Sequence, residues 1–171
     1  MKKTAVVLAS LMVAACSSSP KTNVAQVSQQ NVKNASTVAS AHATTAADLE
    51  LSKLNAAIQQ LQKQSDYFDY NKYVIKSQYQ NVIQKEAEFI KAHKNDFITL
   101  EGNADERGGE GYNLALGQKR AEAVQKSLLK YGVPANQIKL VSLGKDKPRL
   151  TCHEEKCWKE NRRVDFQHKL S

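Results

Sequence analysis

The chain has 171 residues and a net charge of +8 at pH 7, so it is long enough for one domain with further segments outside it. Residues 66–171 hold 19 Lys and Arg against 15 Asp and Glu, so this part of the chain carries a net charge of only +4. A basic balance of this size suits an anionic envelope surface. Aromatic residues make up 6% of the chain and no Arg cluster lies among them, so nucleic-acid binding is not indicated.

The N-terminus has the features of an export signal. Residues 1–15 join two lysines to an apolar run that ends in small residues, and this run is too short to span a bilayer. The run VAAC at residues 13–16 resembles the bacterial lipobox, which is cleaved just before its cysteine. The resemblance implies that Cys16 carries a diacylglyceryl thioether and an amide-linked acyl chain such as palmitate, and several chains anchor more firmly than one. Ser17 resembles the residue after the cysteine in lipoproteins exported to the outer membrane.

Two different segments connect this signal to the remainder of the chain. Residues 16–47 are predicted to form the lipidated cysteine and a disordered tether, because residues 17–47 contain no aromatic, Leu, Ile or acidic residue. Residues 48–64 are predicted to form a short amphipathic helix. Its apolar residues recur at spacings of three, four and three: Leu51, Leu54, Ile58 and Leu61. This seam fits either packing on the chain's own domain or self-association.

Strand and helix patterns alternate between residues 65 and 171. Alternating apolar residues predict strands, and apolar residues spaced by three and four predict helices. Helices that alternate with strands indicate one sheet covered by helices on one face, so residues 65–171 are predicted to form a single α+β domain. In chain order the expected elements are a strand at 67–70, a helix at 78–94, a strand at 97–103, a helix at 113–131, and strands at 138–144 and 163–168.

The turn that follows the strand at 97–103 holds the most informative charges. Asp105 and Arg107 lie just before two glycines, which break regular structure. Arg120 lies near the apolar face of the next helix, so it is expected to point toward this turn. An acidic turn and an Arg that face each other across a cleft match a zwitterionic ligand. From the residues alone, a helix-capping role for Asp105 and a solvated position for Arg120 stay open.

These motifs resemble a known family. The sequence GNADERGGEGYNLALGQKRAEAV at residues 102–124 resembles the signature of the OmpA-like peptidoglycan-binding domain, in the form found in its lipoprotein branch. The resemblance runs from about Asp66 to Phe166 and includes, in the family's order, FDYN, GVPANQI, VSLGKDKP and NRRV. It implies a βαβαβ core plus a further strand, and a binding role that uses no cofactor and no metal.

The resemblance also implies a ligand and its binding residues. The ligand is the diaminopimelate-bearing stem peptide of peptidoglycan, which carries an ammonium and a carboxylate on one carbon. Asp105 corresponds to the acid that holds the ammonium, and Arg120 to the base that holds the carboxylate. The family's other site positions correspond to Phe68, Asp69, Ala104, Arg107, Asn113 and Leu116. We expect Asp105→Ala and Arg120→Ala each to abolish binding to sacculi with the fold intact.

Two further motifs carry structural expectations. In the NRRV motif one Arg usually braces acidic groups inside the domain, which implies a structural role for Arg162 or Arg163. Cys152 and Cys157 are expected to form a disulfide, because an exported protein meets an oxidising compartment and some members of the family have a Cys pair in this loop. A zinc site that adds His153 and His168 to these cysteines is an alternative with poor ligand spacing, and free thiols are another.

The function expected from these features is that of an outer-membrane lipoprotein with its domain in the periplasm, tying the membrane to the wall. The resemblance implies TolB of the Tol system as a partner, beside other Tol or OmpA-like envelope proteins; a wall-binding lipoprotein outside that system is the alternative. A murein-modifying enzyme is disfavoured, because neighbouring carboxylates such as Asp105 and Glu106 rarely form the opposed pair that glycoside hydrolysis needs. The sequence also has no Ser-His-Asp order and no metal-ligand helix motif.

Overall fold

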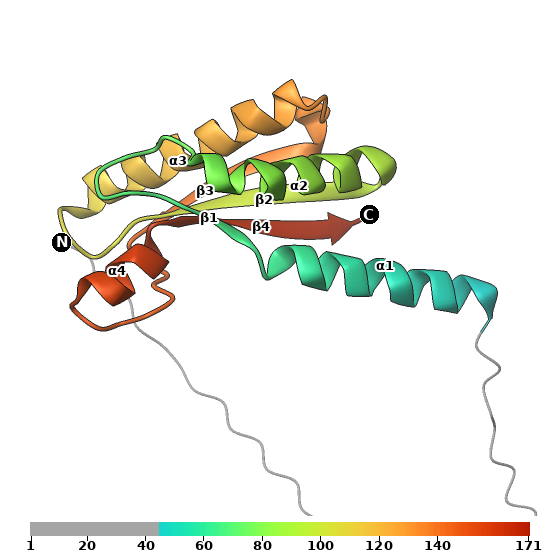
Figure 1. Cartoon of the computed structure of the whole chain (residues 1–171), viewed down its shortest axis with the longest axis horizontal. Helices are drawn as coiled ribbons and strands as arrows, with labels where there is room; N and C mark the ends of the chain where they lie inside the picture. The colour runs from blue at the N-terminus through green and yellow to red at the C-terminus, as the bar shows by residue number, and fades with distance from the viewer. Residues whose placement is uncertain (1–44) are drawn as a thin grey trace, which may run out of the picture. The chain divides into compact units, whose positions relative to one another are not determined.

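The computed structural model describes residues 45–171 (Figure 1). The predicted signal peptide, Cys16 and nearly all of the predicted tether lie outside the described residues. Within residues 45–171, no helix is both long and apolar enough to cross a bilayer.

Four strands form one mixed sheet in the order β1-β4-β2-β3. They are β1 (Ser65–Tyr67), β2 (Asp96–Asn103), β3 (Ile138–Gly144) and β4 (Arg163–Leu170). β2 and β3 are parallel, and β4 lies antiparallel between β1 and β2. The parallel pair is joined by a long helix, as a parallel connection requires, and the expected α+β fold is confirmed.

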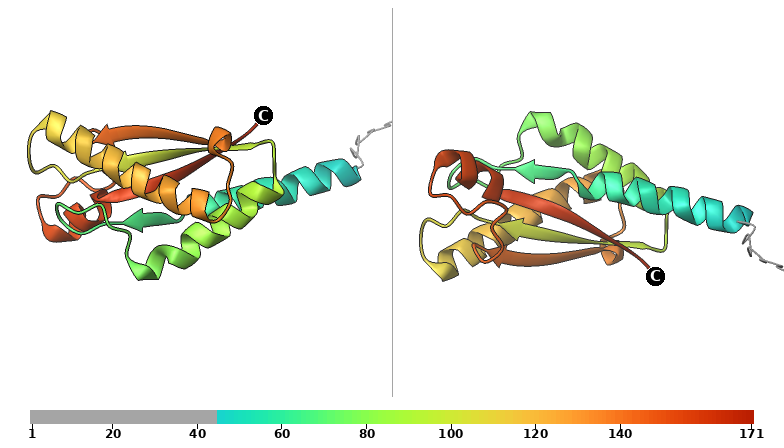
Figure 2. Two further views of the ribbon diagram at one scale, coloured as in Figure 1. Left: turned by 90° about the horizontal axis from the view of Figure 1, so that it is seen from above. Right: turned by 90° about the horizontal axis from the view of Figure 1, so that it is seen from below.

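Two helices cover one face of this sheet and build the core. α2 (Gln80–Ala92) and α3 (Glu110–Lys130) lie on the same side of the strands (Figure 1), and α3 crosses in front of the strands when the domain is seen from above (Figure 2). Their apolar faces meet the inward side chains of the strands because the spacing of three and four in the helices matches the alternation in the sheet. The buried core consists of Phe68, Ile83, Ala87, Ile90, Ile98, Leu100, Ala121, Val124, Leu128, Val133, Ile138, Val164 and Phe166.

α1 (Ala46–Gln62) begins two residues before the predicted helix and contacts β4. A capping box between Thr45 and Asp48 starts it. Its apolar seam is buried only at the C-terminal end, where Ile58 is 8% exposed, whereas Leu51 is 53% exposed. The interpretation that this helix packs on its own domain therefore holds for the C-terminal part of the seam.

Several boundaries differ from the sequence prediction, and one helix was not predicted. The first strand is Ser65–Tyr67 and not 67–70, because the chain turns at Asn71, which has a φ of 56°. α3 starts at Glu110 with Gly109 as its N-cap, so Gly111 is helical where a turn was expected. The short helix α4 (Glu155–Asn161) was not predicted at all, because seven residues show too little periodicity.

A close approach of backbones fixes the start of α3 against β2. A Cβ atom on Gly102 would lie 1.9 Å from the carbonyl oxygen of Gly117, so only glycine permits this contact. Gly117 is equally restricted, because its Cβ would lie 2.6 Å from the carbonyl oxygen of Gly102. The contact holds the first turns of α3 beside the polar turn at 104–109.

Candidate functional site

Three segments meet at one end of the domain. They are the turn 104–109 between β2 and α3, the segment 68–76 between β1 and α2, and the region around α4 (Figure 1). The first two segments and the start of α3 border a cavity of about 310 Å³, which is lined by Tyr70, Asn71, Asp105, Arg107, Gly108, Tyr112, Asn113 and Leu116. Four of the eight predicted site residues are thus brought together, namely Asp105, Arg107, Asn113 and Leu116.

Asp105 is the acidic centre of this cavity and is only 4% exposed. Arg107 donates to both of its carboxylate oxygens, from Nε to Oδ1 at 3.2 Å and from Nη2 to Oδ2 at 2.8 Å. Arg162 Nη1 donates to Oδ2 at 3.2 Å. Burial by itself raises the pKa of Asp105, but the hydrogen bonds from Arg107 and Arg162 outweigh burial and lower it. Asp105 is therefore a fixed carboxylate at neutral pH.

Arg107 is held by hydrogen bonds to Asp105 and by contacts with two aromatic rings. Its guanidinium carbon lies 4.0 Å from the ring centroid of Tyr70 and 4.0 Å from that of Trp158. The hydrogen bond to Asp105 is the largest cause that raises the pKa of Arg107. The side-chain amide of Asn113 donates to the carbonyl oxygen of Arg107 at 3.0 Å. Arg107 is therefore a positive group of fixed orientation in the cavity wall.

Arg120 occupies a different place from the one expected. It is 0% exposed and donates to three backbone carbonyl oxygens: Nε to Lys72 at 2.9 Å, Nη1 to Asn103 at 2.7 Å and Nη2 to Asp69 at 3.2 Å. It is therefore not a solvated residue, and it forms no hydrogen bond or ion pair with Asp105. Burial lowers its pKa to about 10.

The position of Arg120 corrects one expectation. Its side chain projects from the same face of α3 as that of Val124. It therefore lies against the C-terminal end of β2 and against segment 68–76. Removal of its guanidinium would leave the buried carbonyl oxygen of Asn103 and two part-buried carbonyl oxygens without this donor, so Arg120→Ala is no longer expected to leave the fold intact.

The other predicted residues support the cavity from below or lie at its rim. Phe68 is a core residue, 1% exposed, with the guanidinium of Arg120 5.3 Å from its ring centroid. Ala104 is buried and its backbone N–H donates to Gly144. Asp69 has an exposed side chain that pairs with Lys76 at 2.7 Å. These three do not line the cavity.

Sequence reasoning missed several cavity residues, among them Tyr70, Asn71 and Tyr112. The hydroxyl of Tyr112 donates to the side-chain oxygen of Asn71, so two segments 41 positions apart close one side of the cavity. The signal was present in the FDYN and YN motifs, since aromatic and Asn residues beside a polar turn favour ligand contacts.

Both arginines of the NRRV motif form ion pairs with carboxylates inside the domain. Arg162 pairs with Asp105 and with Glu155, and its Nε donates to the carbonyl oxygen of Phe68 at 3.0 Å. Arg163 Nε donates to Asp165 at 2.8 Å. The structural role expected for one of them is therefore found for both.

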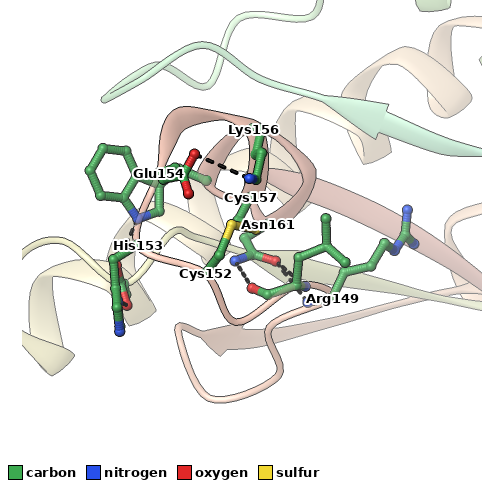
Figure 3. The surroundings of a disulfide bond; sticks show 10 residues. Arg149, Cys152, His153, Glu154, Lys156, Cys157 and Asn161 are labelled. Carbon is green, nitrogen blue, oxygen red and sulfur yellow. Dashed lines mark hydrogen bonds and ion pairs between the residues drawn. A yellow bond between two sulfur atoms is a disulfide. The ribbon is translucent and has the colours of Figure 1, made fainter.

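Cys152 and Cys157 are joined by a disulfide that closes the loop before α4, as expected (Figure 3). Asn161 holds the other end of α4, since its side chain accepts from Arg149 N–H at 2.7 Å and donates to the Leu150 carbonyl at 2.7 Å. His153 contacts Glu106, and within residues 45–171 no group of His, Cys, Asp and Glu is arranged to hold a metal. The zinc interpretation is therefore wrong for the disulfide-bonded cysteines.

A larger cavity of about 790 Å³ lies elsewhere, between segment 73–75 and the outer face of α3. Its charged residues are Lys119, Glu122, Lys126 and Lys130. It has no carboxylate held against a guanidinium, so the smaller cavity around Asp105 is the better candidate for a zwitterionic ligand. That cavity offers fixed charges of both signs, which is sufficient to hold a ligand without reacting with it.

The chain is similar to a known protein family and to several known proteins. The model of the OmpA family matches residues 67–162. A peptidoglycan-associated lipoprotein of Agrobacterium fabrum is 43% identical over 98 residues, which are 57% of this chain and 55% of that protein. The chain thus spans little more than half the length of this curated relative.

Solved structures show the same fold. The crystal structure of the peptidoglycan-associated lipoprotein from Burkholderia pseudomallei has a TM-score of 0.61 and 47% identity, and the match covers 62% of this chain and 90% of that one. The C-terminal domain of Helicobacter pylori MotB, with a TM-score of 0.59 and 24% identity over 63% of this chain and 85% of that one, shares the fold alone.

The names of these relatives denote an association of those proteins with peptidoglycan. The family model covers more than half of the chain and includes β2, α3, β3 and the turn with Asp105. This chain belongs to the OmpA family.

Proposed function

We propose that this chain is an outer-membrane lipoprotein that binds peptidoglycan non-covalently and ties the membrane to the cell wall. The observation that carries the proposal is the cavity wall in which ionised Asp105 lies against the oriented guanidinium of Arg107. Fixed groups of opposite charge are complementary to the ammonium and carboxylate on one carbon of diaminopimelate.

In this proposal some of the predicted residues bind the ligand and the others support the cavity. Asp105 receives the ammonium, and Arg107 attracts the carboxylate, while Asn113 and Leu116 shape the cavity wall. Arg120 adds positive charge beneath the site and fixes the carbonyl groups of residues 69, 72 and 103. Phe68 and Ala104 form the support, and Asp69 lies at the rim.

The membrane part of the proposal rests on sequence. Cys16 carries the lipid, residues 17–47 form the tether, and residues 65–171 reach the wall. We propose TolB of the Tol system as the protein partner, because the relatives carry the name of peptidoglycan-associated lipoprotein. A pull-down with purified TolB tests this point, and binding to sacculi without binding to TolB would place the chain outside the Tol system.

Co-sedimentation with purified sacculi tests wall binding, with the full chain kept in detergent micelles. We expect Asp105→Asn to weaken binding by about tenfold or more, since a charge-assisted hydrogen bond in a buried site is lost. Asp146→Asn, at an exposed aspartate outside the cavity, is the matched control. Sacculi with lysine in place of diaminopimelate lack the carboxylate and should bind weakly. Equal sedimentation of wild type and Asp105→Asn would contradict the proposed site.

A further inference from the structure

α4 is fastened to the turn of the candidate site by its side chains. The indole Nε1 of Trp158 donates to Glu106 Oε1 at 2.7 Å. Glu155 pairs with Arg162 and lies 3.7 Å from Nη2 of Arg107. His153, just before the helix, contacts Glu106 at 2.7 Å. The helix that the sequence did not reveal therefore contacts the turn 105–107 directly.

Trp158 completes the enclosure of Arg107. Asp105 occupies the Nε and Nη2 edge of the guanidinium. The ring centroids of Tyr70 and Trp158 each lie 4.0 Å from the guanidinium carbon. Within residues 45–171, Nη1 of Arg107 makes no hydrogen bond. A planar guanidinium restrained in this way keeps one fixed edge for a ligand carboxylate.

The disulfide explains how so short a helix holds its tryptophan in place. α4 has seven residues, and helices of this length are not stable alone. The Cys152–Cys157 bond closes a loop with a sequence separation of 5, and Trp158 follows directly after it. The N–H groups of Cys157 and Trp158 both donate to the Glu154 carbonyl at 2.9 Å. The disulfide therefore fixes the turn from which Trp158 projects.

We propose that the disulfide-closed helix α4 contributes to the specificity of the binding site. Trp158 is a positioning residue, which holds the guanidinium of Arg107 with one edge toward the ligand carboxylate. The inference rests on the proposed function and deepens it. It assigns the preference for a free carboxylate to the Trp158–Arg107–Tyr70 stack, and not to the charge of Arg107 alone. Loss of the stack, or of the disulfide behind it, then lowers this preference even though every charged residue remains.

The test uses the full chain in detergent and two soluble probes. These are the stem tripeptide that ends in diaminopimelate and the same peptide with the free side-chain carboxylate converted to an amide. Affinities are measured by calorimetry. For the wild type we expect tighter binding of the free carboxylate. For Trp158→Leu and for the double variant Cys152→Ser/Cys157→Ser, we expect this ratio to fall by about five- to tenfold, the size of a partly desolvated cation–π contact.

Two controls separate positioning from general stability. Trp158→Phe keeps an aromatic face and should retain most of the ratio. Tyr73→Leu removes another ring that faces a cation, since Lys119 Nζ lies 5.4 Å from its centroid, and it should leave the ratio unchanged. Because Trp158 is the only tryptophan of the chain, its fluorescence also reports ligand binding in the unmodified protein.

The outcomes distinguish the two proposals. If the wild type binds neither probe, the proposed function fails. If it binds, but Trp158→Leu and the double serine variant keep the wild-type ratio, the positioning role is overturned and wall binding stands. If Trp158→Leu does not fold, the double serine variant and the fluorescence of the wild type test the inference. It is overturned if the double serine variant keeps the wild-type ratio of affinities. It is also overturned if the Trp158 emission of the wild type does not respond to saturating tripeptide.

Discussion

Two clusters of charged side chains lie in this small domain, and they differ in their exposure and in their balance of charge. The ligand-end cluster consists of Asp105, Arg107, Arg120, Glu155 and Arg162, and it borders the cavity. The closed cluster consists of Asp66, Glu86, Asp96 and His168, whose side chains come from β1, α2, β2 and β4. The first has more cations than carboxylates, whereas the second has one imidazole for three carboxyl groups.

The closed cluster is fully buried and incompletely paired. His168 bonds Glu86 through Nε2 at 2.9 Å and Asp96 through Nδ1 at 2.7 Å. Within the described part of the chain, both oxygens of Asp66 and one oxygen each of Glu86 and Asp96 have no hydrogen-bond partner. Burial, and then the nearby Glu86, raise the pKa of Asp66 to about 8.

The two clusters differ in how their charge responds to pH. Arginines keep their charge at any physiological pH, so the ligand-end cluster presents the same field to a ligand throughout that range. The closed cluster retains protons instead, so its contribution to stability depends on pH. The four variants below separate these two behaviours.

Arg120→Ala should have the largest effect on stability. Three backbone carbonyl oxygens lose a charged donor, and the carbonyl of Asn103 is buried. We expect a loss of about 3 kcal/mol in the free energy of unfolding. Urea denaturation followed by circular dichroism measures it, with the exposed neighbour Lys119→Ala as control. A midpoint equal to that of the wild type would show that Arg120 does not hold segment 69–72.

His168→Gln should destabilise the domain in a pH-dependent way. Burial by itself lowers the pKa of His168, but the hydrogen bonds to Asp96 and Glu86 outweigh burial and raise it from 6.5 to about 9. A histidine whose pKa is higher in the folded than in the unfolded state stabilises the folded state when it is protonated. The contribution of His168 to stability is therefore complete below pH 6.5, the pKa in the unfolded state, and is lost as pH rises through about 9, the pKa in the folded state.

We therefore expect His168→Gln to lose on the order of 2 kcal/mol below neutral pH and much less in alkaline buffer. Urea midpoints across this range measure the difference, and His153→Gln, at an exposed histidine, is the control. A constant difference at all pH values would contradict a titrating role for His168.

Asp66→Asn should stabilise the domain at alkaline pH. The unfolded carboxyl group ionises near 3.8, whereas the folded one keeps its proton until about 8, so wild-type stability falls as pH rises between these values. The amide removes this fall, and we expect a gain of about 1 to 2 kcal/mol near pH 8 and none near pH 4. Thermal unfolding at both pH values measures it. Asp146→Asn should show no such dependence, and a loss of stability at pH 8 would contradict the proposed protonation of Asp66.

Arg107→Ala should have the smallest effect on stability and a large one on binding. Its side chain is 30% exposed, and Arg162 still neutralises Asp105, so we expect a loss of about 1 kcal/mol in unfolding free energy. Binding to sacculi should fall at least tenfold because the cavity loses its oriented cation. Lys156→Ala, at an exposed lysine of α4, is the control. Unchanged sedimentation would remove Arg107 from the site.

Long elements were predictable because their own residues carry the signal. Ile98 and Leu100 alternate in β2, and Ala121, Val124 and Leu128 recur at helical spacing in α3, so burial follows from periodicity. β1 and α4 have three and seven residues. Elements this short show no period, so their bounds were misplaced or missed.

The sequence by itself determined the α+β fold, the family, the acidic turn with Asp105 and the cysteine pair, because these follow from local period, residue type and motif order. Only the tertiary structure decided which groups Arg120, Trp158 and Asp66 meet. The carbonyl oxygens that Arg120 binds lie up to 51 positions away, and Trp158 meets Glu106 across 52 positions. The partners of a buried charge are set by how strand ends and loops pack in space, and a one-dimensional pattern does not contain that geometry.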